Sequence, residues 1–322
     1  MKKDDTIHIV ACLDKGFVMP TGVMLFSVCV NNPDINILFH IVVDESVTEE
    51  NKRDILQTTS NFIAKNIVFY LVDSQLTRQF PLHKGTRITQ ATYYRLFLTD
   101  ILPSTIDKVL YLDGDIIVRK TLLPLWKIDL TDYAIGGAFD WAEGRKEIYT
   151  RLGYPSTKGH FNAGVLLINL SYWRIHNLKK AFVEYVWNYS DRIKYEDQDV
   201  LNVVLQDQKL LIPIKYNFQT GFLKKIPEWN YLKYEEEVNE GLSDPVIVHY
   251  TERYKPWYAD TFPYHPYRNC FLKYQRKTMW KGVCRDLRPL NIKIRNFIGG
   301  ILRKLRILKP IKSPFIDVIP ID

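Results

Sequence analysis

Short apolar runs alternate with helical segments through the first third of the chain, and this order restricts the fold more than any other feature. Runs typical of buried strands occupy 7–12, 37–43 and 67–72. Residues 20–31 are apolar at helical spacing, and Thr48 with the two glutamates after it has the form of a helix N-cap with an acidic first turn. This β-α-β-α-β order predicts a parallel sheet covered by helices, the α/β class of fold.

Acidic side chains follow several of the predicted strands. Further segments predict strands at 108–112, 134–139 and 165–169 and helices at 91–102, 181–189 and 197–206. The acids that come directly after strands are Asp14, Asp73, Asp113 with Asp115, and Asp140. Ligands of open α/β sheets bind outside the carboxyl ends of the strands, so we expect the chemistry of the protein at that edge.

The positive charge of the chain is confined to its C-terminal part. Residues 270–322 carry 13 Lys and Arg against 3 Asp and Glu, whereas residues 1–269 carry 31 against 33. A slightly acidic core argues against nucleic acid as a partner. A length of 322 residues allows two domains, or one large α/β domain with an extension. The α/β pattern gives way after residue 261 to aromatic, proline and basic residues, so we expect domains 1–265 and 266–322.

Cysteine usage and hydropathy predict the compartment. None of the four cysteines belongs to a CxxC pair, which argues against a zinc or redox motif and against a disulfide framework. The N-terminus shows no apolar stretch of signal-peptide length, and no run of about 18 apolar residues could span a membrane. These features predict a reduced, cytoplasmic location.

The turn Asp113-Gly114-Asp115 lies between two apolar runs and is the strongest local signal. Two converging carboxylates suit a hard divalent cation such as Mn²⁺ or Mg²⁺. Asp-Gly is also a favoured hairpin pair, and the turn alone supports a plain β-turn equally well. The apolar runs on both sides favour the metal site, because an uncompensated pair of acids is costly at the edge of a core.

The segment YEDQDVLN (195–202) places Asp197, Gln198 and Asp199 before an apolar helical run. Acids at a helix N-terminus interact well with the helix dipole, and we assign that structural role to Asp199. Capping alone does not explain Gln198.

Two further segments carry polar residues beside apolar runs. His249 ends a β-branched run, where a lone histidine is more often structural. Lys255 is a candidate phosphate-binding residue, and an ordinary surface lysine is the default interpretation. Asn162, Ala163 and Gly164 enter an apolar run, where small residues either admit a ligand close to the backbone or mark a turn.

Taken in this order, the segments resemble glycosyltransferase family 8, the retaining sugar-nucleotide enzymes that include bacterial lipopolysaccharide galactosyl- and glucosyltransferases and the glycogenins. The matching stretches are 91–118, 161–170, 195–202 and 249–257. The resemblance implies a GT-A fold over 1–265, a single Rossmann-like nucleotide-binding domain with a mixed central sheet. It also implies transfer of glucose or galactose from UDP-glucose or UDP-galactose to a saccharide or glycolipid acceptor in lipopolysaccharide or other cell-surface glycan synthesis.

The resemblance assigns metal and donor contacts. Asp113, Asp115 and His249 would hold Mn²⁺, or Mg²⁺ in its place, and the cation would bind the donor diphosphate and neutralise the departing UDP. Donor contacts are implied for Ala11, Cys12, Asp14, Lys15, Arg95, Asp113, Gly114, Asp140, Asn162, Ala163 and Lys255.

Gln198 matches the family's glutamine at the reacting face of the donor sugar, and Asp197 lies beside it. An amide is a poor nucleophile, so we expect same-face attack through an oxocarbenium-like state instead of the covalent route of retaining hydrolases. Gln198 and Asp197 would position groups or stabilise charge, and the leaving diphosphate would take the proton of the acceptor. The chain departs from the lipopolysaccharide enzymes at Glu252, which replaces a glycine before Lys255, and an acid close to a diphosphate must point away.

Residues 290–312 combine an apolar stripe with a basic face. This pattern is typical of helices that adsorb to anionic lipid, at about 1 kcal/mol per basic residue near the surface. Trp280 and Phe297 are candidate interfacial anchors. A basic helix docked on the core, or contact with nucleic acid, also accounts for the charges, but lipopolysaccharide enzymes of the family carry similar tails. We therefore expect peripheral attachment to the inner face of the cytoplasmic membrane.

Two other functions use the same features. A nonenzymatic membrane protein on this fold would not need the intact set of Asp113, Asp115, Gln198, His249 and Lys255. A metal-dependent nucleotidyltransferase or phosphohydrolase also uses paired carboxylates, but the family order of the motifs argues against it.

Overall fold

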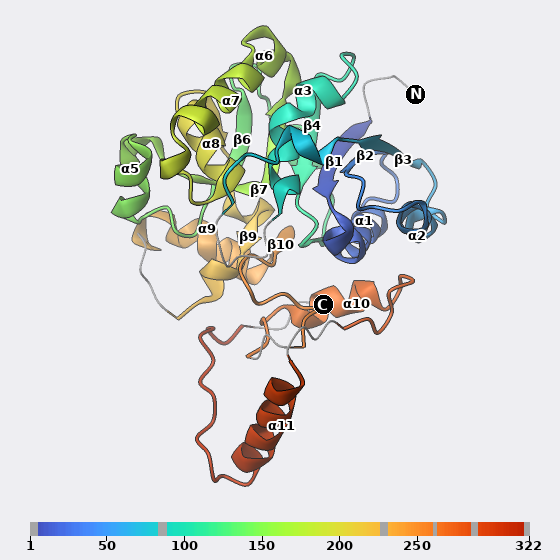
Figure 1. The fold of residues 1–322 in the computed structure, drawn as a ribbon, viewed down its shortest axis with the longest axis vertical. Helices are drawn as coiled ribbons and strands as arrows, with labels where there is room; N and C mark the ends of the chain where they lie inside the picture. The colour runs from blue at the N-terminus through green and yellow to red at the C-terminus, as the bar shows by residue number, and fades with distance from the viewer. Residues whose placement is uncertain (1–5, 83–88, 226–230, 260–262, 285–288, 319–322) are drawn as a thin grey trace.

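The computed structural model describes residues 6–82, 89–225, 231–259, 263–284 and 289–318, and Figure 1 shows their arrangement. The centre is a seven-stranded sheet with the strand order β3-β2-β1-β4-β7-β6-β8. In chain order these strands are β1 (Ile7–Leu13), β2 (Ile37–Val43), β3 (Lys65–Leu71), β4 (Lys108–Leu112), β6 (Ile135–Phe139), β7 (Phe161–Asn169) and β8 (Lys209–Leu211). The six strands predicted from apolar runs are therefore confirmed, with shifts of a few residues at their ends.

The sheet is mixed in direction. Strands β3, β2, β1 and β4 are parallel, β7 is antiparallel to β4 and β6, and β8 is parallel to β6. The parallel pairing predicted from the β-α alternation is confirmed for β1, β2 and β3, and β7 makes the sheet mixed, as the family resemblance implies. In consequence the start of β7 and the ends of β1, β4 and β6 meet at one edge of the sheet.

Apolar side chains cover both faces of the sheet. On one face, alternate residues of β1, β2 and β4 pack beneath α1 (Val18–Asn31), α2 (Glu49–Thr59) and α4 (Leu123–Trp126). The other face packs beneath α3 (Leu98–Ile101), α6 (Leu170–Ile175), α7 (Leu178–Asn188) and α8 (Glu196–Val204). Helices α5 (Lys146–Leu152) and α9 (Tyr231–Ser243) lie beyond the β6 end of the sheet in Figure 1. The predicted cap of α2 is confirmed, since Thr48 Oγ1 accepts a hydrogen bond from the backbone N–H of Asn51 at 3.2 Å.

The segment predicted as a helix at 91–102 is mostly a 3₁₀ helix. It runs over Gln90–Phe97 and continues into the short α3. Residues three apart in a 3₁₀ helix share a face, so Thr92 and Arg95 both face the candidate site described below while Tyr94 and Phe97 are buried. The tighter helix thus separates site residues from core residues.

A small three-stranded sheet of β5 (Ile116–Val118), β10 (Ile247–His249) and β9 (Phe218–Gln219) lies beside the main sheet. β4 pairs with β1 and β7, whereas β5 pairs with β10. The Asp113-Gly114-Asp115 turn therefore links two sheets and does not close a hairpin.

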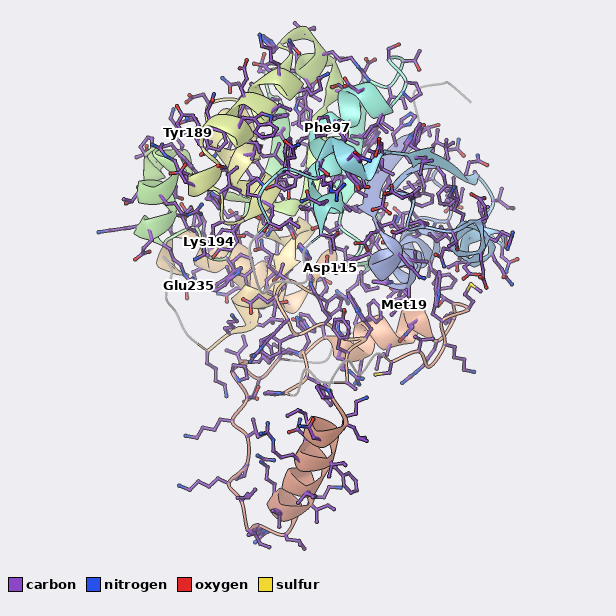
Figure 2. All side chains as sticks on the ribbon, viewed as in Figure 1. Met19, Phe97, Asp115, Tyr189, Lys194 and Glu235 are labelled. Atoms are coloured by element: carbon purple, nitrogen blue, oxygen red, sulfur yellow. The ribbon has the colours of Figure 1, made fainter. Side chains whose placement is uncertain are left out.

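The C-terminal region has a part on the core and a part away from it. Helix α10 (Arg268–Gln275) buries Cys270 and Phe271 beside the small sheet. A Cβ added at Gly22 would lie 2.0 Å from the Trp280 ring, so Trp280, predicted as an interfacial anchor, packs directly on α1 and is partly buried. Helix α11 (Leu290–Lys304) projects from the core (Figure 1), and Figure 2 shows its side chains in open space. Among the helices that the structure describes, none has the length and apolarity that crossing a membrane requires.

Candidate active site

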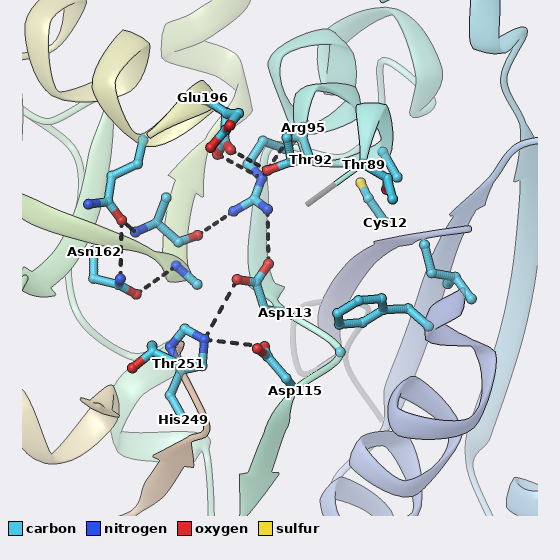
Figure 3. Close-up of a pocket in the computed structure, with 18 of the residues that line it drawn as sticks. Cys12, Thr89, Thr92, Arg95, Asp113, Asp115, Asn162, Glu196, His249 and Thr251 are labelled. Atoms are coloured by element: carbon cyan, nitrogen blue, oxygen red, sulfur yellow. Dashed lines mark hydrogen bonds and ion pairs between the residues drawn. The ribbon is translucent and has the colours of Figure 1, made fainter. Parts of the chain in front are cut away.

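A cleft of about 620 Å³ opens where β1 and β4 end and β7 begins, beside β10 (Figure 3). Its volume lies within the range of small-molecule sites. Most of the residues predicted to act at the site line it, namely Cys12, Asp14, Arg95, Asp113, Gly114, Asp115, Asn162, Ala163, Asp197, Gln198, His249 and Lys255.

Three predicted residues lie outside the lining. Ala11, in β1, is fully buried in the core. The backbone N–H of Lys15 donates to Ser46 Oγ at 3.0 Å, outside the cleft. Asp140 lies behind the lining, where its carboxylate Oδ2 accepts hydrogen bonds from Asn162 and Gln198.

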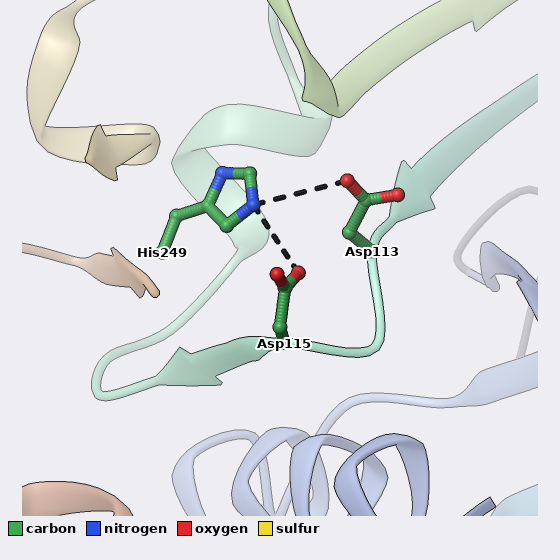
Figure 4. A group of neighbouring side chains, drawn as sticks. All are labelled: Asp113, Asp115 and His249. Carbon is green, nitrogen blue, oxygen red and sulfur yellow. Dashed lines mark ion pairs between the residues drawn. The ribbon is translucent and has the colours of Figure 1, made fainter. Parts of the chain in front are cut away.

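Asp113, Asp115 and His249 converge at the junction of the two sheets (Figure 4). Ligand atoms from the three side chains lie within 4.8 Å of one another. His249 Nε2 is 3.2 Å from Asp115 Oδ1 and 3.8 Å from Asp113 Oδ2. Two carboxylates and one imidazole at this spacing suit a hard divalent cation and leave coordination positions for a ligand.

A chain of amides fixes which nitrogen of His249 faces the carboxylates. The carboxylate of Asp140 only accepts, so Asn162 must turn its Nδ2 toward Asp140 and its Oδ1 toward Nδ2 of Asn217, at 2.9 Å. Asn217 then presents its Oδ1 to His249 Nδ1 at 2.8 Å, and that nitrogen must carry a proton. In the neutral imidazole, Nε2 therefore points a lone pair at two acids, an arrangement that a cation between them satisfies.

His249 and Asp113 lie so close to the backbone of β7 that residue 164 must be a glycine. A Cβ added to Gly164 would lie 2.1 Å from His249 Cε1 and 2.9 Å from Asp113 Oδ2. The backbone N–H of Asp113 also donates to the Gly164 carbonyl at 2.8 Å. The small residue predicted either to admit a ligand or to mark a turn lets the His249 and Asp113 side chains approach the strand.

Arg95 connects Asp113 with Asp197. Its NH2 nitrogen lies 2.9 Å from Asp113 Oδ1, its Nε lies 3.0 Å from Asp197 Oδ2, and the guanidinium stacks over the Tyr111 ring at 4.1 Å. The Tyr111 hydroxyl also donates to Asp113 Oδ1 at 2.9 Å. Burial raises the pKa of Asp197 to about 6, although Arg95 acts in the opposite direction. Arg95 thus fixes the metal-site carboxylate from one side and the acid beside Gln198 from the other.

Lys255 reaches the cluster of Asp113, Asp115 and His249 from the loop after β10. Its ammonium donates to Asp115 Oδ2 and to the Tyr250 carbonyl. Burial favours a raised pKa for Asp115, but Lys255 and His249 together hold that pKa well below its usual range. A half-buried cation next to the acidic cluster suits an anionic group bound there.

Gln198 lies at the opposite wall and uses both ends of its amide. Its Oε1 accepts hydrogen bonds from Asn162 Nδ2 and from the backbone N–H of Ala163, each at 3.1 Å. Its Nε2 donates to Asp140 Oδ2 at 3.1 Å and lies 3.2 Å from His160 Nε2. Burial lowers the pKa of His160 to about 4, so its imidazole is neutral and can accept that bond.

Asp199 has the structural role predicted for it, through hydrogen bonds. Its Oδ2 accepts from the backbone N–H groups of Lys194 and Tyr195 at 2.7 and 2.8 Å, and from Arg151 at 2.6 Å. These bonds hold the start of α8, where Glu196 has φ +39° and Asp197 and Gln198 follow.

Glu252 lines the cleft and stands where the family pattern has glycine. Its backbone keeps the conformation that a glycine adopts. Its φ is +62°, in the left-handed region that glycine adopts most easily. Its carboxylate pairs with Lys224 at 2.5 Å, so this acid has a positive partner although it lines the cleft.

Several residues of the site have no counterpart in the sequence predictions. Thr92 and Tyr111 lie inside segments that match the family. Their contacts, Thr92 with Asp197 and Tyr111 with Arg95, are visible only in the folded structure. Asn217 lies between the motifs, 32 residues before His249, and nothing in its local sequence marks it. Phe17, Tyr195 and Thr251 also line the cleft.

Replacing Asn217 by alanine is expected to weaken Mn²⁺ binding by about 10- to 100-fold, because the proton on His249 Nδ1 loses its acceptor and the ligand nitrogen loses its orientation. Mn²⁺ titration followed by electron paramagnetic resonance measures the dissociation constant. Asn188→Ala, at an exposed position at the end of α7, is the matched control. An unchanged Mn²⁺ affinity in Asn217→Ala contradicts this role.

Comparison with known proteins places these features in one family. The model of Glycosyl transferase family 8 matches residues 8–261. The lipopolysaccharide 1,3-galactosyltransferase of Salmonella typhimurium is 30% identical over 293 residues, covering 89% of this chain and 82% of that protein. The lipopolysaccharide glucosyltransferase WaaO of Escherichia coli is 30% identical over 305 residues, covering 92% and 85%.

A solved structure shows the same fold. The crystal structure of the galactosyltransferase LgtC in complex with donor and acceptor sugar analogs has a TM-score of 0.71 and 29% identity, over 90% of this chain and 100% of that one. The mixed α/β sheet and the GT-A architecture are thereby confirmed. The chain belongs to glycosyltransferase family 8, and it is a glycosyltransferase.

Proposed function

We propose that the protein is a retaining hexosyltransferase that moves glucose or galactose from UDP-glucose or UDP-galactose to a saccharide or glycolipid acceptor in cell-surface glycan synthesis, with Mn²⁺ as cofactor. The observation that carries the proposal is the geometry of His249, whose Nε2 faces Asp113 and Asp115 while Gln198 lies across the same cleft. Relatives that are named as lipopolysaccharide glucosyl- and galactosyltransferases support the class of sugar.

Residues in different parts of the cleft have different proposed roles. Asp113, Asp115 and His249 would hold the cation, which, when bound, acts as a Lewis acid and neutralises charge on the departing diphosphate. Lys255 adds a positive charge at the same end. Asp140 and Asn162, which hold Gln198, would orient the hexose through the same network. The segment from Ala11 to Lys15, at the end of β1, would hold the uridine, with Cys12 and Asp14 in the lining.

The contacts around Gln198 favour same-face attack. The amide is bonded at both ends, and its oxygen is held by two donors. The two carboxylates nearest it are also held: Asp197 by Arg95 and Thr92, and Asp140 by Asn162 and the backbone N–H of Ala142. Carboxylates bound in this way stabilise positive charge on the sugar better than they attack it.

The test is a donor screen. The protein is incubated with UDP-glucose or UDP-galactose and Mn²⁺, with an EDTA-treated sample as control, and released UDP and the anomeric configuration of the transferred sugar are measured. We expect UDP release with one of the two donors, retention of configuration, and loss of activity with EDTA. No UDP release with any common sugar nucleotide would overturn the proposal, and release of UMP would indicate a phosphohydrolase.

We also propose that α11 attaches the enzyme to the inner face of the cytoplasmic membrane. Its apolar side chains follow helical spacing on one stripe and are strongly exposed, namely Leu290, Ile294, Phe297, Ile298, Ile301 and Leu305. Basic residues such as Lys293, Arg303 and Lys304 extend from the same helix. An exposed apolar stripe with basic neighbours fits the interface of an anionic bilayer.

A Phe297→Glu/Ile301→Glu variant is expected to lower affinity for anionic liposomes by at least about 100-fold, because each large apolar side chain contributes about 1.5 kcal/mol or more when buried. Co-sedimentation with vesicles containing phosphatidylglycerol measures the affinity. An Asn296→Glu variant, at an exposed position beside the stripe, adds negative charge without removing apolar area. Hydrolysis of soluble donor should stay unchanged in both variants, and full vesicle binding by the double variant would refute the anchor.

A further inference from the structure

Residues 313–318 return from α11 to the core, and we call them the C-terminal strap. The strap lies beside the segment that follows β9. The backbone N–H of Lys225 donates to the Pro314 carbonyl, and that of Ile316 donates to the Leu223 carbonyl, each at 2.8 Å. Phe315 and Lys224 form an antiparallel bridge between these bonds. Figure 1 shows the chain leaving the core before α11 and coming back to it at the C-terminal end.

Phe315 anchors the strap. Its side chain is 2% exposed, although α11 and most of residues 305–312 are exposed. Its ring meets the Tyr254 ring edge-on with centroids 4.9 Å apart, and lies 5.8 Å from the His265 ring. The side chain therefore fills a place in the core beneath the small sheet, which a chain ending before residue 313 would not contain.

The groups that the strap contacts support the loop 249–257, which carries His249, Glu252 and Lys255. Tyr254 directly precedes Lys255. His265 Nε2 lies 3.2 Å from Thr220 Oγ1, and that hydroxyl donates to the Thr251 carbonyl at 3.0 Å. Lys224, which bridges to Phe315, pairs with Glu252. Three separate contacts thus lead from the strap to one loop.

We propose that the C-terminal strap positions the loop 249–257, and that Phe315 is the positioning residue that sets Lys255 for binding of the nucleoside diphosphate. The identity of that ligand rests on the proposed function. Phe315 does not touch the cleft, so its effect passes through Tyr254 and His265. The strap would therefore change affinity for the ligand while leaving the catalytic side chains in place.

Full-length Phe315→Ala is expected to bind UDP in the presence of Mn²⁺ about 10-fold more weakly and to raise KM for the donor by a similar factor, with a smaller change in kcat, because the loop is displaced and not removed. Phe315→Leu, which refills most of the volume, should recover UDP affinity to within about 3-fold of the wild type. Asp317→Asn, at an exposed position in the strap, is the control and should match the wild type. Isothermal calorimetry gives the affinities. Wild-type UDP affinity in folded Phe315→Ala would overturn the proposal.

A second variant and a ligand-independent measurement cover the case in which Phe315→Ala does not fold. Ile316→Pro removes the N–H that donates to Leu223 and keeps the Phe315 ring. Hydrogen exchange of the amides in 249–257, measured against those of β1, should rise in this variant and in Phe315→Ala while β1 stays protected. Equal exchange in the loop contradicts the strap's role, whether or not UDP binds. Failure of the wild type to bind UDP would count against the proposed function alone.

Discussion

Replacing Asp113 by asparagine should abolish Mn²⁺-dependent binding of UDP and lower kcat/KM for the UDP-sugar by at least about 1000-fold, since a cation contributes several kcal/mol to stabilising a departing phosphate. Asparagine keeps an oxygen for Arg95 and Tyr111, so the fold of the β4–β5 turn should persist. The substitution removes a negative ligand atom from a cluster that has only two carboxylates and one imidazole. Calorimetric titration of UDP with and without Mn²⁺ measures the effect directly.

Asp73→Asn is the matched control for this variant. Asp73 follows β3 at the same edge of the sheet, where its carboxylate accepts the backbone N–H of Gln75 at 2.9 Å, and it does not line the cleft. The control should bind UDP like the wild type. If Asp113→Asn also binds UDP like the wild type in the presence of Mn²⁺, the metal assignment is wrong.

Replacing Gln198 by alanine should lower kcat by about 100- to 1000-fold, the usual effect of removing one preorganised polar group from a transition state. Alanine removes the amide that joins Asp140 and Asn162 to the backbone of Ala163. KM for the donor should change little, because the metal ligands and Lys255 lie on the other side of the cleft. Steady-state kinetics with the donor identified by the screen separates kcat from KM.

Gln206→Ala, near the C-terminal end of α8, tests whether the effect comes from the helix instead of the amide. Among the residues that the structure describes, the Gln206 side chain donates to the Val203 carbonyl, within one helical turn. This variant should keep wild-type kcat. A rise in KM without a fall in kcat for Gln198→Ala would show that the residue binds the donor and does not stabilise the transition state.

The strands of the main sheet could be predicted from local sequence, because a buried strand appears as a short, nearly continuous run of apolar residues. β2 and β4 are apolar on both faces, and their predicted bounds coincide with the observed ones. β9 has two residues and pairs only with β10, so no periodicity could reveal it. The 3₁₀ helix at Gln90–Phe97 has the same apolar spacing as an α-helix of that length, and the difference depends on what Thr92 and Arg95 contact.

The candidate site was predictable where its residues fall in motifs, and not where it depends on contacts between them. The resemblance to the family named Asp113, Asp115 and His249, and the structure brings them together. Asn217 orients His249 from a segment with no motif, and Lys224 pairs with Glu252 from 28 residues away. Such pairings are properties of the folded chain, because they arise only after β9 and β10 are placed side by side.

The position of the strap also sets an order of events during synthesis. Domains fold from the N-terminus as the chain emerges from the ribosome. A nascent chain that has emerged as far as residue 312 already contains each side chain of the cleft and the whole of α11, but Tyr254 still lacks its partner Phe315. Docking of the strap would then follow the emergence of the whole of α11, because residues 313–318 leave the ribosome after that helix.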